Sequence, residues 1–163
     1  MSQSVSSKAG FTLLEILLVV GIIAILAGIV ILAINPSKQL GDARNAQRRA
    51  DVLTILNAIY QYSIDTNGTV PPVITATSAC VLNTMEIATG TATSAAVAVG
   101  LYPYLVGSAA ASSTYIVSIP RDPLATTTGL GSGYAVTKGS VGSTRITVCA
   151  PLAENGVTIS VTR

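Results

Sequence analysis

Gly10-Phe11-Thr12-Leu13-Leu14-Glu15 opens the stretch of sequence that decides the fold, an apolar run that continues to Ile34. From Ile16 to Ile34 no residue is charged or strongly polar. A helix over this run, rising ~1.5 Å per residue, is long enough to cross a hydrocarbon core of about 30 Å. The sequence therefore predicts a membrane-spanning helix near the start of the chain.

The carboxylate of Glu15 stands at the beginning of this apolar run. An ionised side chain within a membrane helix costs on the order of 3 kcal/mol, so it requires a partner cation or a functional role. Cleavage of the chain between Gly10 and Phe11 would create a new α-amine about one helical turn from Glu15. That amine is the cation that the carboxylate lacks.

The polar leader ending at Gly10, the Phe-Thr-Leu-Leu-Glu sequence and the apolar helix together resemble the type IV prepilin family. The resemblance implies cleavage after Gly10 by a membrane-embedded prepilin peptidase and N-methylation of Phe11. It also implies assembly, by a platform and its ATPase, into a homo-oligomeric helical filament. In that filament Glu15 would neutralise the Phe11 amine of a neighbouring subunit.

Two alternatives to this interpretation are an ordinary secretory signal and an uncleaved signal anchor. A secretory signal places a shorter apolar segment before its cleavage site, which carries small residues in an A-x-A-like pattern. The segment Ala24-Ile25-Leu26-Ala27 matches that pattern poorly, and the apolar run is longer than such a segment. The prepilin interpretation is favoured over both.

The composition argues against catalysis and gives no support for a nucleic-acid surface. The 163 residues include no histidine and no tryptophan, which removes the commonest metal ligand and general base. A formal net charge of +2 gives no electrostatic argument for binding nucleic acid, a question that the sequence leaves open. We expect no enzymatic activity and no cofactor.

Cys80 and Cys149 are the only cysteines, and both lie far downstream of the apolar run. In a small exported domain, one pair of cysteines indicates one disulfide. Closing a loop of this length would stabilise the fold by ~4 kcal/mol. Two buried free thiols are the alternative.

Basic residues after the apolar run favour the opposite topology, because the positive-inside rule counts Lys and Arg near the helix ends. One basic side chain, Lys8, precedes the run, whereas four follow it: Lys38, Arg44, Arg48 and Arg49. The cysteine pair, the charge-poor Ser/Thr-rich composition and the resemblance nevertheless agree on export. We therefore expect a single-pass inner-membrane precursor that becomes a cell-surface or periplasmic filament.

Asn35-Pro36 interrupts the helix after the apolar run. Proline either kinks a continuing helix, or follows Asn as N-cap and begins a new one. Apolar residues then recur every three or four positions, which predicts an amphipathic helix within 35–68. We expect its arginines Arg44, Arg48 and Arg49 on a solvated or intersubunit face. The stripe expected to pack on a sheet comprises Leu40, Ala43, Ala46, Ala50, Leu53, Leu56, Tyr60 and Ile64.

Residues 69–163 are expected to form a small exported α+β region. Short helical turns are predicted around 81–87 and 97–105, and the last three of four predicted strands are expected to form an antiparallel meander. These strands are Tyr115–Ile119, Tyr134–Lys138, Arg145–Cys149 and Val157–Thr162. The predicted fold is α+β: after a leader 1–10, a long helix with an apolar half 11–34 and an amphipathic half 35–68 packs on a small antiparallel sheet. The resemblance implies that this fold is pilin-like.

Three further motifs have residue types that could bind a ligand or accept a modification. Gly129-Leu130-Gly131-Ser132-Gly133 precedes a predicted strand and opens no helix, so it predicts a loop and not a phosphate site. Asp122 is expected to fix a turn; calcium is the alternative there, although no second carboxylate stands close in sequence. Asn67-Gly68-Thr69 matches the N-glycosylation sequon, a triplet that also arises by chance.

The sequence thus favours a structural subunit of a type IV pilus. A major pseudopilin of a type II secretion system is the alternative, because the N-terminal motif is common to both. A membrane-anchored exported enzyme would need a catalytic constellation that the sequence does not contain.

Overall fold

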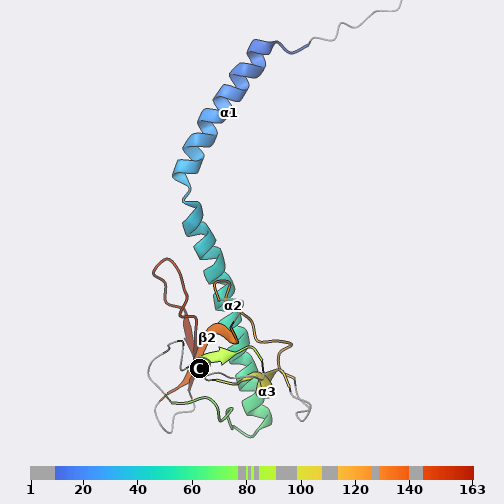
Figure 1. Cartoon of the computed structure of the whole chain (residues 1–163), viewed down its shortest axis with the longest axis vertical. Helices are drawn as coiled ribbons and strands as arrows, with labels where there is room; N and C mark the ends of the chain where they lie inside the picture. Colours follow the sequence, from blue (N-terminus) through green and yellow to red (C-terminus); the bar gives the residue numbers. More distant parts are fainter. Residues whose placement is uncertain are drawn as a thin grey trace, which may run out of the picture. The chain divides into compact units, whose positions relative to one another are not determined.

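A computed structural model of the chain describes residues 10–76, 80, 82, 85–90, 99–107, 114–125, 129–139 and 145–163. Most of the predicted leader therefore lies outside the described residues. Two long helices come first, α1 (Leu13–Ala33) and α2 (Pro36–Asp65), as Figure 1 shows. The chain divides into two compact units, Met1–Gln39 and Leu40–Arg163.

The break between α1 and α2 begins a new helix, the second of the two expected outcomes for Asn35-Pro36. The Asn35 side chain accepts hydrogen bonds from the Lys38 amide at 3.2 Å and from the Ser37 hydroxyl at 2.6 Å. These are the bonds of an N-cap residue, and Pro36 occupies the first helical position, where its missing N–H costs nothing. α2 is therefore a separate helix with its own N-cap, and not a continuation of α1.

The described residues of the second unit form one four-stranded sheet, in the order β1-β2-β3-β4 with every neighbouring pair antiparallel. Its strands are β1 (Glu86–Ala88), β2 (Gly131–Lys138), β3 (Ile146–Cys149) and β4 (Ser160–Thr162). The predicted α+β fold is confirmed, and so is the antiparallel meander formed by the last three strands.

Two local predictions, one of a strand and one of a helical turn, are wrong. Tyr115–Ile119 forms no strand: the amides of Tyr115 and Ile116 both bond the carbonyl of Leu105, at the end of the short helix α3 (Tyr102–Leu105). The predicted helical turn at 81–87 is contradicted by β1, although part of that segment lies outside the described residues. In both segments long-range contacts decide the local structure.

The buried face of α2 is not the expected stripe. Leu40, Leu53 and Ile64 of that stripe are 59%, 46% and 76% exposed. The buried residues of α2 are instead Gly41, Asn45, Arg48, Val52, Ile55, Leu56, Ala58 and Ile59. The observed face lies on another side of the helix from most of the expected stripe, and the two sets have Leu56 in common. Its first half is polar, and a search for apolar periodicity therefore selects the neighbouring row of Ala and Leu.

The core lies between α2 and one face of the sheet. Because side chains alternate along a strand, Tyr134 and Val136 of β2 and Ile146 and Val148 of β3 share that face. All four are fully buried in one cluster with the apolar half of the α2 face. The hydroxyl of Tyr134 donates to Asp51 on α2 at 2.6 Å, which satisfies its polar end within the core.

Candidate processing, assembly and clamp sites

The start of α1 places the predicted cleavage site outside the helix. Thr12 is the N-cap, with extended dihedral angles (φ −82°, ψ 149°), and its hydroxyl accepts from the Glu15 amide at 3.2 Å. Gly10 and Phe11 precede the helix and are exposed. The Gly10–Phe11 peptide bond is therefore in non-helical, accessible backbone, as a cleaved bond must be.

Glu15 lies in the first turn of α1, three residues after the N-cap. Thr12-Leu13-Leu14-Glu15 has the Thr-x-x-Glu spacing of a capping box, and the bond from the Glu15 amide to Thr12 is half of that motif. A carboxylate in a first helical turn is also stabilised by the helix dipole, by about 0.3–1 kcal/mol. This local role is not among those predicted for Glu15, although the Thr-x-x-Glu spacing alone indicates it.

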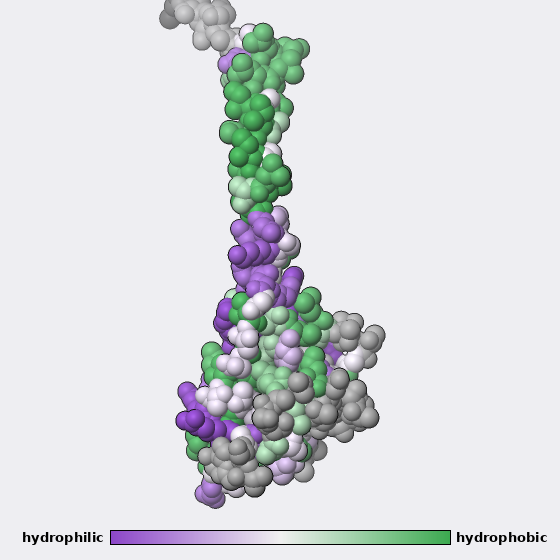
Figure 2. Space-filling view, turned by 90° about the vertical axis from the view of Figure 1, so that its left-hand side faces the viewer, coloured by the Kyte–Doolittle hydropathy of each residue, from purple (hydrophilic) through white to green (hydrophobic). Residues whose placement is uncertain are grey.

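None of the residues of α1 is buried in the structure. Figure 2 shows a surface that is hydrophobic along α1 and becomes hydrophilic where α2 begins. By length and composition this helix can cross a membrane. A helix that is apolar on all sides is stable only when membrane or protein surrounds it.

Comparison with known families matches residues 5–31 to the prokaryotic N-terminal methylation motif. This is the type IV prepilin and pseudopilin signal. Comparisons with curated proteins and with solved structures find no match to the chain. Type IV pilins and pseudopilins are structural subunits, and the signal implies processing by a prepilin peptidase and a membrane-anchored precursor.

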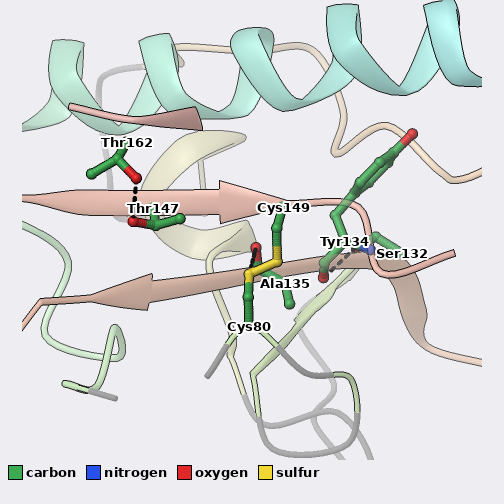
Figure 3. Close-up of a disulfide and its surroundings, with 7 residues drawn as sticks. All are labelled: Cys80, Ser132, Tyr134, Ala135, Thr147, Cys149 and Thr162. Atoms are coloured by element: carbon green, nitrogen blue, oxygen red, sulfur yellow. Dashed lines mark hydrogen bonds between the residues drawn. A yellow bond between two sulfur atoms is a disulfide. The ribbon is translucent and has the colours of Figure 1, made fainter. Parts of the chain in front are cut away.

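The predicted cysteine pair forms a disulfide: Cys80 and Cys149 are bonded, with 6.4 Å between their Cα atoms. Cys149 ends β3 and pairs with Ala135 of β2, so both point away from the face that carries Tyr134. Figure 3 shows Cys80 reaching the sheet on this opposite face. The disulfide thus ties the connecting segment after α2 to the middle of the sheet.

We call the second unit, Leu40–Arg163, the head. Arg48 of α2 forms four side-chain hydrogen bonds with described residues of the head. Its guanidinium donates to both carboxylate oxygens of Asp122, at 2.7 and 3.0 Å, and both side chains are fully buried. It also donates to the side-chain oxygen of Asn45 and to Glu154, each at 2.9 Å. These contacts join α2 to two separate loops.

The Glu154 loop is fixed to α2 by a second set of bonds. Arg44 donates twice to the Glu154 carboxylate, at 2.5 and 2.7 Å, and Asn45 exchanges two bonds with the Glu154 backbone. The pKa of Glu154 is lowered to about 2 by hydrogen bonds from Arg44 and then Arg48. We call this set, Arg44, Asn45, Arg48, Asp122 and Glu154, the arginine clamp.

The arginine clamp corrects one prediction and refines another. Arg48 is not on a solvated face, because the loops of Asp122 and Glu154 cover it, whereas Arg49 is exposed as expected. Asp122 does fix a turn, since its side chain accepts from the Leu124 amide at 2.8 Å. Its two oxygens already bind a guanidinium, and the described residues include no group of three or more His, Cys, Asp or Glu that could hold a metal.

The loop predicted for the glycine-rich segment is found only at Gly129 and Leu130, because β2 begins at Gly131. Gly133 has φ +81°, and a Cβ there would lie 2.6 Å from the Cβ of Asp122. The Gly133 amide donates to the Glu86 carboxylate at 2.9 Å. The Gly133 amide is therefore already bonded to a carboxylate of the same chain. The absence of a side chain at Gly133 leaves room for Asp122.

Proposed function

We propose that this prepilin is the major subunit of a type IV pilus, which polymerises into a surface filament after removal of the leader. The single observation that carries the proposal is an α1 helix with no buried residue in a chain with the prepilin signal. In the precursor the bilayer covers this helix. After extraction from the bilayer, only the α1 helices of other copies offer an apolar surface of matching length.

The assembly step needs a partner for Glu15 as the helix leaves the bilayer. Cleavage after Gly10 leaves the amine of Phe11 as the new terminus, and N-methylation keeps that amine basic. Pairing it with Glu15 of the adjacent subunit would neutralise both charges inside the helical bundle. The pair also fixes the axial register between subunits, because each chain has one such carboxylate in α1.

The runner-up is a major pseudopilin of a type II secretion system, whose short periplasmic filament uses the same N-terminal signal. The charge-poor exported head supports neither assignment over the other. A retraction ATPase encoded beside this chain would favour the pilus, whereas a secretin with several pseudopilins would favour secretion.

The test is deletion of the encoding gene, followed by electron microscopy of the cell surface and analysis of secreted proteins. We expect long surface filaments to disappear while secretion continues. Complementation with the parent chain should restore filaments, and complementation with Gly10→Val should restore only an unprocessed membrane precursor. Normal filaments with a loss of secreted proteins would reverse the assignment to the pseudopilus.

A further inference from the structure

α2 ends in a tight turn that is closed by backbone bonds. Asn67 and Gly68 both have left-handed dihedral angles, with φ 55° and 86°. The Gly68 amide donates to the Ser63 carbonyl at 2.7 Å, and the Thr66 amide donates to the Tyr62 carbonyl at 3.0 Å. The turn therefore forms without any contribution from the carboxamide of Asn67.

Asn67 and Thr69 are both on the surface of this turn. Both residues are exposed, and neither side chain forms a hydrogen bond in the described part of the structure. A Cβ added at Gly68, between them, would meet no atom within 4 Å. The carboxamide and the hydroxyl are thus accessible together, with room around the turn for a bulky group.

Asn67 is the one asparagine of the sequence followed by Ser or Thr two residues later without an intervening proline. Asn35 is excluded by Pro36. The other asparagines lack the hydroxyl residue: Asn45, Asn57, Asn83 and Asn155.

The turn at Asn155-Gly156 provides a built-in comparison. It is also exposed and left-handed at both residues, with φ 58° and 69°, and a Cβ at Gly156 also meets no atom within 4 Å. It differs in the residue two positions after asparagine, which is Val157 in place of a threonine. The Asn155 carboxamide moreover donates to Asp42 at 2.9 Å.

We propose that Asn67 is an N-glycosylation site that accepts an oligosaccharide from a lipid diphosphate donor at the outer face of the inner membrane. Nδ2 of Asn67 bonds to the anomeric carbon of the first sugar, and the bond from that carbon to the diphosphate oxygen breaks. The lipid diphosphate leaves, and the amide loses one proton. The Thr69 hydroxyl is the second element that the transferring enzyme requires. The proposal rests on the export of the head, which is part of the proposed function.

The test uses mature protein purified from the cells that produce it, analysed by intact mass and by fragmentation of its peptides. We expect a chain that begins at Phe11 and carries a glycan on Asn67, with Asn155 unmodified. Asn67→Gln and Thr69→Val should each abolish the added mass, and Thr69→Ser should retain it. Thr69→Val is a gentle change, because the Thr66 hydroxyl bonds the Thr69 backbone carbonyl and not its side chain.

Two results would overturn the site. An unmodified Asn67 in a chain that begins at Phe11 rejects glycosylation while leaving the filament proposal intact. An added mass that persists in Asn67→Gln assigns the sugar to a hydroxyl elsewhere in the chain. A chain that retains its leader would instead reject the proposed processing.

Discussion

Arg48 and Asp122 form a two-pronged ion pair with both side chains fully buried, 74 residues apart in sequence. The pKa of Arg48 is raised by its hydrogen bonds to Asp122, which exceed the lowering effect of burial. Burying a guanidinium is costly unless its donors are satisfied, and here α2 and both loops supply acceptors. The pair therefore fixes the rotation of α2 against the head.

Replacement of Arg48 by Met should destabilise the head strongly, because it leaves the carboxylate of Asp122 buried without its cation. We expect the free energy of unfolding to fall by about 3–5 kcal/mol. Arg49→Met is the matched control on the exposed side of the same helix and should stay within about 0.5 kcal/mol of the parent. Urea unfolding of the mature chain in detergent, followed by tyrosine fluorescence, measures both. Equal losses in the two variants would show that the buried pair has no special role.

Glu154 should make the head less stable as the pH falls into the acid range. Its pKa is about 2 in the folded chain, against an ordinary value of 4.5. A lowered carboxyl pKa contributes stability that is complete above pH 4.5 and is lost as the pH falls toward 2. Melting temperatures of the parent and of Glu154→Gln, measured from pH 6 to pH 2, should therefore converge at the acid end. Parallel curves across that range would contradict the role given to Glu154.

The disulfide should contribute about 4 kcal/mol in the chain-entropy treatment, since it closes a loop with a sequence separation of 69. Cys80→Ser should lower the urea midpoint by a corresponding amount, and reductant should shift the parent toward it. The double variant Cys80→Ser/Cys149→Ser is the control, which reductant should leave unchanged. Two alkylatable thiols in protein purified without reductant would contradict the bond and favour a cytoplasmic head.

The sequence predicts the elements that depend on local patterns. The apolar run of α1, the N-cap at Asn35 and the alternation in β2 and β3 each specify structure over a few neighbouring residues. The cysteine pair is predictable for a different reason: a sequence with two cysteines can form one intrachain disulfide. These features can be predicted without knowing which residues distant in sequence contact them.

The arginine clamp could not be predicted in the same way. The local sequence predicts that Arg48 is a surface residue. Its burial depends on ion pairs with Asp122 and Glu154, which are distant in sequence. The buried row of α2 is visible in the sequence only if polar residues are allowed on it, as Asn45 and Arg48 are. A rule that searches for apolar periodicity alone selects the adjacent row, which the structure leaves exposed at Leu40 and Leu53.

Glu15→Gln separates the two roles that the structure and the proposed assembly give to Glu15. Glutamine is accepted at the N3 position of a capping box, which Glu15 occupies, so the start of α1, membrane insertion and leader cleavage should all be retained. The variant removes the charge, so the Phe11 amine of the next subunit would be buried without its partner. We expect at least a tenfold loss of filaments, since an unpaired buried charge costs several kcal/mol and 1.4 kcal/mol is already tenfold. Glu15→Asp keeps the charge with a shorter reach and should assemble partially.

Thr12→Ala is the converse control for Glu15→Gln, because it removes the capping hydroxyl and keeps the carboxylate. It should cost the helix about 1 kcal/mol and leave filament yield close to that of the parent. Filament counts by electron microscopy, beside the ratio of mature to precursor chain on immunoblots, measure assembly and processing separately. Normal filament yield from Glu15→Gln, with Thr12→Ala impaired, would make the helix cap, and not the charge, the determinant of assembly.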